Sequence, residues 1–225
     1  MHKTELHLHT KEVSPCCDCP TEITVERYLA AGYTTVVVTD HFTPDLVSRA
    51  GSPEAAAEHL FDGYREFCRL AAGRLHVLSG FELRLEENRN EYLVYGLGRE
   101  FLLQNPDLVM LTRREALARV HGAGGLMFIA HPFRDRMTVI NPNGFDGVEI
   151  FNAHNGHDSR NELAYAYARH HGLAGIAGTD YHHTTNAPTA GIMTNEPITN
   201  EKELLAILRS GGYRTFGEIA PKSEE

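Results

Sequence analysis

The sequence predicts an α/β fold in which parallel strands alternate with helices. Three observations support this fold class: short apolar segments alternate with longer amphipathic ones, capping residues precede the longer segments, and glycines follow them. The chain has 225 residues and no internal repeat or linker-like stretch, which fits one domain better than two. We therefore expect residues 1–225 to form a single domain whose last few residues are a tail.

The short apolar segments have the length and composition of β-strands. We expect strands at residues 5–8, 34–39, 75–81, 126–130, 147–151 and 173–177, with a further short strand at 92–95. In α/β sheets and barrels, the loops that follow the strands converge on one face of the molecule. Residues with a chemical role should therefore lie just after these segments.

The helix starts are marked by a capping side chain three residues before a carboxylate, as in Thr112 with Glu115. Ser159 with Glu162 and Asn200 with Glu203 repeat this pattern, and Ser52 precedes a proline that suits the first helical position. We expect helices to begin near residues 24, 53, 113, 160 and 201 and to end at Gly32, Gly73, Gly122, Gly172 and Gly211.

Charge and hydropathy restrict the partners of the protein. The formal net charge is −9 with histidines counted as neutral, so we do not expect extended nucleic acid as a partner. No run of about 18 apolar residues occurs, and the start MHKTELHLHT lacks the apolar core of a signal peptide, so we expect a cytoplasmic protein that does not enter a membrane. A small anionic substrate stays possible because bound divalent cations would dominate the local potential. The sequence does not indicate an oligomeric state.

Three of the four cysteines lie close together, at Cys16, Cys17 and Cys19, and Cys68 is separate. The pair Cys16 and Cys19 would be half of a zinc ribbon, but no second pair follows, so we expect reduced thiols in a loop. The alternative is that one thiol of this loop reaches a metal centre, because the loop follows His7 and His9 directly.

The predicted strand ends carry a set of metal-ligand residue types. His7 and His9 project from the same face of an extended segment, because side chains alternate, and Asp180 and His182 repeat this spacing. A carboxylate such as Glu82 can bridge two cations, and His with carboxylate ligands suits zinc, iron(II) or manganese. The residues placed at strand ends are His7, His9, Asp40, His41, Glu82, His131, Asn152, His154, Asp180 and His182.

Five short motifs in order resemble those of the PHP (polymerase and histidinol phosphatase) superfamily: His7-x-His9-Thr10, Thr39-Asp40-His41, Gly80-Phe81-Glu82, Ala130-His131-Pro132 and Gly178-Thr179-Asp180-Tyr181-His182. The resemblance implies a distorted (β/α)7 TIM-like barrel with two or three divalent metals. It also implies a stand-alone phosphoesterase that uses a metal-activated hydroxide.

Carried over to this chain, the resemblance implies a ligand set for each metal. One metal would take His7, His9, Glu82 and Asp180, and Glu82 would bridge to a second metal that His131 also binds. His41 and His182 would bind a third. The family supplies an acidic or His ligand shortly after the first motif, and in this chain that role falls either to Glu12 or to no residue of the protein. The stretch Asn88–Tyr92 offers no His for the second metal.

Two further residues are candidates for substrate contact. Arg134 follows His131 in a loop at the same face, where a guanidinium could bind two phosphate oxygens. We favour this contact over the alternative, a surface ion pair. His154 could protonate the leaving group or contact substrate, or it could be a hydrogen-bonded loop residue. Asp40 is expected to orient His41 or another neighbour without binding metal.

The leading functional prediction is a metal-dependent phosphoric ester hydrolase, similar to histidinol phosphatase, that acts on a small soluble phosphomonoester. An alternative keeps the same site but assigns it to nucleotides or oligonucleotide ends. A third possibility, from a different class, is a non-catalytic PHP module that binds metal.

Overall fold

The computed structural model describes residues 1–218, so the predicted tail lies outside the described residues. Its main feature is a mixed sheet with the strand order β10-β9-β1-β2-β4-β5-β6-β7-β8, and β3 pairs with β4. The strands are β1 (His2–Glu5), β2 (Tyr33–Val38), β3 (His41–Phe42), β4 (His76–Arg84), β5 (Glu91–Tyr95), β6 (Leu126–Ile129), β7 (Gly147–Asn152), β8 (Ala174–Gly178), β9 (Ala190–Thr194) and β10 (Arg214–Gly217).

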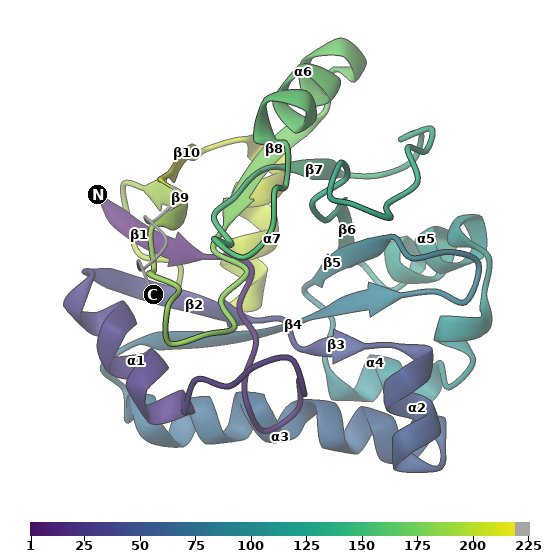
Figure 1. The fold of residues 1–225 in the computed structure, drawn as a ribbon, viewed down its shortest axis with the longest axis horizontal. Helices are drawn as coiled ribbons and strands as arrows, with labels where there is room; N and C mark the ends of the chain where they lie inside the picture. Colours follow the sequence, from purple (N-terminus) through teal and green to yellow (C-terminus); the bar gives the residue numbers. More distant parts are fainter. Residues whose placement is uncertain (219–225) are drawn as a thin grey trace.

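The sheet curls into a nearly closed barrel, as Figure 1 shows, and this confirms the predicted distorted TIM-like fold. Its two ends meet where the Tyr213 hydroxyl donates to the carbonyl of Gly175 at 3.1 Å. The distortion comes from strand direction. β5 runs antiparallel to both β4 and β6, and β9 runs antiparallel to β1 and β10, whereas the remaining neighbours in the path are parallel.

Helices cover the outside of the barrel. They are α1 (Thr21–Ala30), α2 (Pro44–Ala50), α3 (Pro53–Ala71), α4 (Arg99–Gln104), α5 (Arg113–Gly122), α6 (Asn161–His171) and α7 (Glu201–Ser210), with a short 3₁₀ helix η1 at Leu108–Met110. In Figure 1, α1 and α3 lie along one side of the sheet and α6 lies on the opposite side. Within residues 1–218, no helix is both long enough and apolar enough to cross a membrane.

The longest helix, α3, illustrates how the sequence forms these elements. The Ser52 hydroxyl accepts from the Ala55 amide at 3.1 Å and Pro53 occupies the first turn. Its apolar face includes Leu60 and Phe61, which are buried in the same core cluster as Phe81 of β4. Burial of such side chains stabilises the fold by about 1.5–3 kcal/mol each.

Most predicted elements agree with the structure to within a few residues, but the start of α6 does not. The predicted capping box of Ser159 and Glu162 is wrong: α6 begins at Asn161, after a left-handed Arg160, and no side chain caps it. The Ser159 hydroxyl instead donates to Asn152 at 3.2 Å. The polar network at the end of β7 therefore outcompetes the helix for this hydroxyl.

The first strand also differs from its prediction. β1 ends at Glu5, and residues 6–9 form a separate extended segment. The cause is Glu5 itself, whose buried Oε1 accepts from the amides of Leu6, His7 and Thr179, each at 2.9 Å. One carboxylate therefore ends the strand and turns the first motif toward the residues that follow β8.

Candidate metal centre

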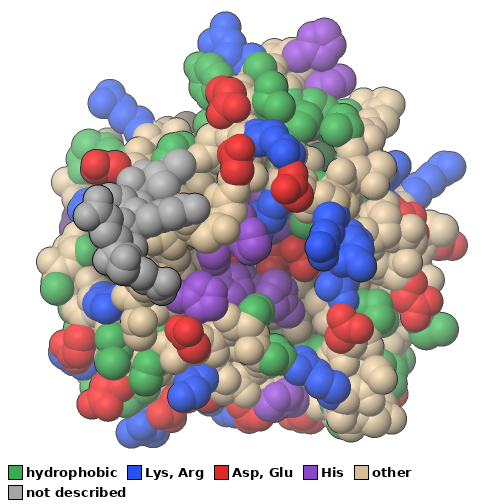
Figure 2. Space-filling view, viewed as in Figure 1, with side chains coloured by type: hydrophobic (Ala, Val, Ile, Leu, Met, Phe, Trp, Pro, Cys, Tyr) green, Lys and Arg blue, Asp and Glu red, His purple; other side chains and the backbone are tan. Residues whose placement is uncertain are grey.

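The first and last motifs of the chain lie against one another at the carboxyl ends of β1 and β8. Leu8 forms an isolated parallel bridge with Tyr181, and the His9 amide donates to the Tyr181 carbonyl at 3.1 Å. The Asp180 amide donates to the carbonyl of His7 at 2.8 Å. These backbone contacts bring the His7 and His9 imidazoles to the Asp180 carboxylate. Figure 2 shows histidines gathered near the centre of this face, beside acidic side chains.

A first group of candidate ligands surrounds one point. Nε2 of His7 lies 3.1 Å from Nε2 of His9, 3.3 Å from Oε1 of Glu82 and 3.4 Å from Oδ1 of Asp180. Nε2 of His9 lies 3.3 Å from Oε2 of Glu82 and 3.3 Å from Oδ1 of Asp180. Ligand atoms of one cation lie about 3 to 3.5 Å apart when each metal bond is about 2.1 Å long. All four side chains are buried and match a single cation in spacing and chemistry.

A second group lies on the other side of Glu82. Nε2 of His131 is 3.1 Å from Oε1 of Glu82 and 3.6 Å from Oε2 of Glu91. Nδ1 of His41 is 2.8 Å from Oε2 of Glu82 and 3.9 Å from Oε1 of Glu91. The β4–β5 pairing brings Glu91 close to Glu82, because Arg84 pairs with Glu91 and Glu82 with Leu93. Glu82 thus lies between two sets of ligands, as a bridging carboxylate would.

A third group consists of imidazoles alone. Ligand nitrogens of His9, His41 and His182 all lie within 4.8 Å of one another. The Nδ1–H of His182 donates to the carbonyl of Asp180 at 2.9 Å, which leaves the lone pair on Nε2. An imidazole fixed in this tautomer is suited to metal binding through its other nitrogen.

The unpartnered atoms of the cluster test whether it fits cations. Oε2 of Glu82, Oδ1 of Asp180 and Nδ1 of His41 are buried and make no hydrogen bond. Unpaired buried polar groups cost about 1–3 kcal/mol each, and more when charged, so they are rare in folded proteins. The three atoms belong to the groups described above. The donor set and its unsatisfied atoms therefore fit divalent cations.

Two candidate ligands have strained backbones. His131 has φ of 23° and Asp180 has φ of 53°, in the left-handed region that non-glycine residues rarely adopt. Each residue lies just after a strand, since β6 ends at Ile129 and β8 ends at Gly178. Such strain costs about 1–3 kcal/mol and clusters at functional sites, so its presence at both positions agrees with a functional role.

Buried polar groups hold the candidate ligands from behind. The Nδ1–H of His7 donates to Oε1 of Glu149 at 2.9 Å, which directs Nε2 of His7 into the cluster. Oε2 of Glu149 accepts from the His131 amide at 2.9 Å and from Nδ2 of Asn152 at 3.0 Å. The same amide group of Asn152 also donates to Asp180 at 3.1 Å. Glu149 and Asn152, both from β7, therefore fix three candidate ligands.

Asp40 acts on the first motif and not on His41. Its carboxylate accepts from the amide and hydroxyl of Thr10, at 2.8 and 2.6 Å, and from the Ser14 hydroxyl at 2.7 Å. Oγ of Ser14 lies 3.4 Å from Nδ1 of His9. The neighbour that Asp40 orients is therefore the loop after His9.

The charges of the cluster shift its pKa values strongly. Burial raises the pKa of Glu82, but the His7 and His41 imidazoles outweigh it and hold the pKa well below its usual value. Burial lowers the pKa of His7, yet nearby carboxylates, Asp180 first, hold it well above the usual value. Burial also lowers the pKa of His182, but Asp180 outweighs it and raises this pKa to about 10. Without a cation, the His7 and His182 imidazoles are therefore protonated near pH 7, and a cation would have to displace these protons in order to bind.

Comparison with known proteins agrees with this fold. Residues 158–213, which include Asp180 and His182, match the family PHP_C, described as PHP-associated. The fold resembles that of a two-domain protein from Bacteroides vulgatus that contains a predicted PHP-like metal-dependent phosphoesterase, with a TM-score of 0.68 and 13% identity. The family match thus covers the last quarter of the described chain, and the structural match extends over nearly the whole of it.

The fold of this chain is similar to those of further solved structures. The match to the B. vulgatus protein covers 96% of this chain but only 65% of that one. A candidate metal-dependent phosphoesterase from Bifidobacterium adolescentis matches with a TM-score of 0.57 and 16% identity over 92% of this chain and 96% of its own. An amidohydrolase from Chromobacterium violaceum, with bound sulfate and no metal, matches with a TM-score of 0.54 and 16% identity over 81% of this chain and 88% of its own. At these identities the structures show a likeness of fold alone. No curated protein sequence matches the chain.

One ligand expected from the PHP pattern lies outside the cluster in the structure. Glu12 lies away from the cluster, where its Oε2 accepts from the Thr21 hydroxyl at 2.5 Å. The segment after Thr10 turns back on itself, since the Ser14 amide donates to the Thr10 carbonyl at 3.0 Å, and this turn leaves Glu12 exposed. The other seven predicted ligands all lie in the cluster: His7, His9, His41, Glu82, His131, Asp180 and His182.

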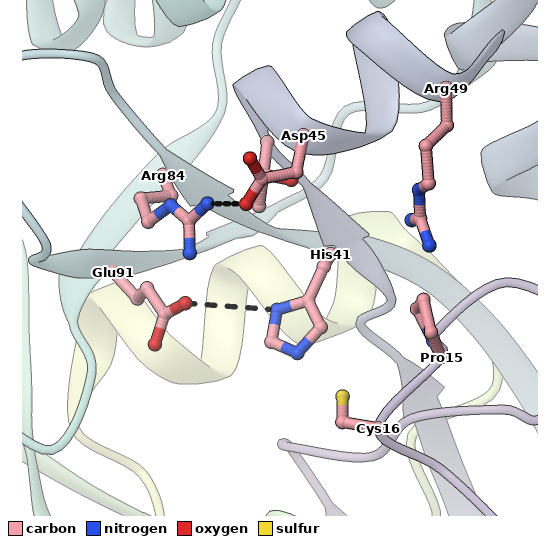
Figure 3. A pocket seen from close by; sticks show the side chains of 8 residues that line it. Pro15, Cys16, His41, Asp45, Arg49, Arg84 and Glu91 are labelled. Carbon is pink, nitrogen blue, oxygen red and sulfur yellow. Dashed lines mark hydrogen bonds and ion pairs between the residues drawn. The ribbon is translucent and has the colours of Figure 1, made fainter.

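Glu91 is a candidate ligand that the sequence prediction missed, although it occupies the stretch where the PHP pattern offers a His. Figure 3 shows Glu91 facing His41 across a cavity of about 320 Å³. The signal available in the sequence was an acidic residue at the start of a predicted strand. Glu149 gives a similar signal, because it is a carboxylate within an otherwise apolar strand.

Arg134 and His154 both lie beside the cluster. Nη2 of Arg134 donates to Oδ2 of Asp180 at 2.5 Å and to Oδ1 of Asn152 at 3.0 Å, so the guanidinium is part of the site and not of a surface ion pair. The His154 ring centroid lies 5.4 Å from that of His182. Burial lowers the pKa of His154 to about 3, so its imidazole is neutral near pH 7.

Proposed function

We propose that this protein is a PHP-type metal-dependent hydrolase of small phosphomonoesters. The observation that carries the proposal is the position of the buried Glu82 carboxylate among the imidazoles of His7, His9, His41 and His131, at 2.8 to 3.3 Å. Bound there, divalent cations would lower the pKa of a water and neutralise the phosphoryl oxygens. The bridging position of Glu82 supports at least two adjacent cations.

Arg134 would bind the phosphoryl group. Asp180 and Asn152 fix the orientation of its guanidinium through Nη2, while Nε is buried and makes no hydrogen bond. A phosphoryl oxygen would satisfy this donor, and a charge-assisted contact of this kind is about twice as strong as a neutral one. The ion pair with Asp180 keeps Arg134 in place before substrate arrives.

His154 would contact substrate as a neutral donor. The Gly156 amide donates to its Nδ1 at 2.9 Å, so the proton of the neutral imidazole resides on Nε2. With its pKa lowered to about 3, His154 cannot supply a proton to a leaving group near pH 7. Of the two roles that the sequence allowed, the geometry favours a hydrogen bond from Nε2 to a substrate oxygen.

The surroundings of the cluster support a small substrate. His41 and Glu91 line the cavity of about 320 Å³, which is the size of a site for a small molecule. Arg49 and Arg84 also line it, as Figure 3 shows, although Asp45 pairs with Arg84 and Glu91 adds a second carboxylate. The cavity size, together with the net charge of −9 of the whole chain, favours a small substrate over a polymer that tracks a broad basic surface.

The test is turnover by protein loaded separately with Mn²⁺, Fe²⁺ or Zn²⁺. The panel contains phosphomonoesters, including histidinol phosphate, together with a nucleoside bisphosphate, an oligonucleotide and simple amides. We expect phosphate release from a monoester that Asp180→Asn abolishes, whereas His59→Gln, which alters a helix surface paired with Asp62, leaves it unchanged. Release only from the nucleotide or oligonucleotide would transfer the assignment to those substrates. No turnover of any ester by metal-loaded protein would refute the proposal.

A further inference from the structure

Two loops of the candidate site are joined by a pair of buried asparagines. Asn155 lies in the loop after β7, directly after His154. Asn186 lies in the loop after β8 that also carries His182. Nδ2 of Asn186 donates to Oδ1 of Asn155 at 2.6 Å, and Nδ2 of Asn155 donates to the carbonyl of Thr185 at 3.0 Å. Each loop therefore both donates a hydrogen bond to the other and accepts one from it.

The asparagine pair continues the connection between β7 and β8 beyond the ends of the strands. The pairing of the two strands ends at Asn152 and Gly178, with one further hydrogen bond from the Ala153 amide to the Gly178 carbonyl at 3.0 Å. Among residues 1–218, no backbone hydrogen bond joins the two loops past that point. The hydrogen bonds between the loops are there made by side-chain amides, which a single substitution can remove.

The loop after β8 is itself firmly held. Oδ1 of Asn186 accepts from the amides of His182 and His183 at 2.9 and 2.8 Å. Nη1 of Arg27, on α1, donates to the Asn186 carbonyl at 3.1 Å and to the Tyr181 hydroxyl at 2.8 Å. This loop can therefore act as a support against which the loop after β7 is positioned.

The orientation of the His154 ring depends on the loop that Asn155 holds. The His154 amide donates to Oδ1 of Asn152 at 3.1 Å, and the Gly156 amide donates to Nδ1 of the ring at 2.9 Å. A Cβ at Gly156 would lie 2.7 Å from Cε1 of this ring, so the ring rests against the backbone of its own loop. The centroid of the ring lies 5.4 Å from that of His182. A shift of the loop would therefore move Nε2 of His154 relative to the cluster.

We propose that Asn155 is a positioning residue, which holds Nε2 of His154 where it can donate to a phosphoryl oxygen of the substrate. This inference rests on the part of the proposed function that makes His154 a substrate contact. Asn155 acts through its neighbour and not on the substrate, because its own side-chain amide is bonded to Asn186 and Thr185. A residue that acts only through His154 should have no effect on phosphate binding once the imidazole is removed.

A double-mutant cycle on phosphate binding tests the proposal. Calorimetry measures the affinity of the Mn²⁺-loaded protein for inorganic phosphate, which requires no turnover. We expect His154→Ala to weaken binding by about 3- to 10-fold, the effect of one lost hydrogen bond, and Asn155→Ala to weaken it by no more than that. The double variant should bind phosphate as His154→Ala does. All three variants should keep the metal content of the unmodified protein.

Asn105→Ala is the matched control. Asn105 is also buried, at the end of α4, and its side chain donates to the Phe101 carbonyl at 2.7 Å and accepts from Arg119 at 2.8 Å. We expect this variant to lose thermal stability as Asn155→Ala does, because each loses two hydrogen bonds of a buried amide. Its affinity for phosphate should equal that of the unmodified protein.

The outcomes separate this inference from the proposed function. Unchanged phosphate affinity in Asn155→Ala, additive effects in the double variant, or no phosphate binding by the Mn²⁺-loaded protein would overturn the role of Asn155. The expected coupling without hydrolysis of any ester would support this role and refute the proposed function. If Asn155→Ala does not fold, Asn155→Ser, which removes the same two hydrogen bonds but keeps a polar side chain, decides the question in the same cycle.

Discussion

Nδ1 of His41 and Oε2 of Glu82 lie 2.8 Å apart as a buried ion pair. A cation that both atoms would bind would replace the proton between them. Glu82→Gln keeps the shape but removes the negative charge and one bridging oxygen. We expect the variant to lose metal and to lower kcat by about a hundredfold or more. Metal content by elemental analysis and initial rates measure both effects.

A control separates this loss from unfolding. The control variant is Asp40→Asn, because Asp40 supports the loop after His9 and does not enter the cluster. We expect this variant to retain more metal than Glu82→Gln at a similar thermal stability. Full metal content in Glu82→Gln would exclude Glu82 as a bridge.

Metal binding should release protons. Nearby carboxylates raise the pKa of His7 well above its usual value and that of His182 to about 10, so both imidazoles are protonated near pH 7 in the absence of metal. A cation binds the neutral imidazole and displaces the proton, so apparent affinity should increase as pH rises from about 6 to 8. Isothermal titration calorimetry in buffers of different ionisation enthalpy measures the number released. Binding heats that do not depend on the buffer would contradict the prediction.

Glu149 should act on metal affinity through His7. It accepts from Nδ1 of His7 at 2.9 Å and from the His131 amide at 2.9 Å, so both of its carboxylate oxygens already have donors. Glu149→Gln should therefore weaken metal binding by about 10–100-fold while kcat at saturating metal stays close to that of the unmodified protein. A metal titration of activity separates the two quantities. A fall in kcat that excess metal does not restore would show a different role.

Gly63 leaves space for the hydrogen bonds that Asp40 accepts from Thr10 and Ser14, next to His9. A Cβ at this position of α3 would overlap Oγ1 of Thr10 and Oδ2 of Asp40, two atoms that hydrogen-bond to each other. Gly63→Ala should gain about 1 kcal/mol from helix propensity but lose more from this overlap, for a net destabilisation of about 1–2 kcal/mol. Chemical denaturation measures it.

Gly122 provides the matched control. It also lies in a helix, the last turn of α5, and a Cβ there would meet no atom within 4 Å. We expect Gly122→Ala to be neutral or slightly stabilising. Equal destabilisation by the two substitutions would exclude the overlap at Gly63 as the cause.

The sequence predicts the start of a helix correctly where a capping residue has no competing hydrogen-bond partner. Thr112 and Glu115 form the predicted capping box of α5, and Asn200 caps α7 as expected. Ser159 shows the limit of such signals, because its hydroxyl has a better partner in Asn152, the last residue of β7, which no local signal before the helix indicates. β9 and β10 were missed because short antiparallel strands carry little periodicity and Gly191 interrupts the first of them.

Part of the candidate site could be predicted from the sequence, namely the residues that lie just after predicted strands. His7, His9, Asp180 and His182 required only the rule that loops after strands converge. Glu91 and Glu12 were not predictable in this way, because their positions depend on an antiparallel hairpin and on a tight turn that no local signal indicates. Whether a carboxylate binds metal is decided by the direction of its side chain, and that direction depends on tertiary structure.

The bridge between Leu8 and Tyr181 joins segments that are far apart in the chain. A cation bound by His7, His9 and Asp180 would close the same long loop a second time, as a cross-link does, and would remove conformational entropy from the unfolded chain. The metal would then stabilise the contact between the first and last motifs, in addition to its part in the reaction. In that case, removal of the metal by a chelator should first speed hydrogen exchange at the backbone amides that join the two motifs, such as those of His9 and Asp180. The amides of β4 and β5 should exchange later.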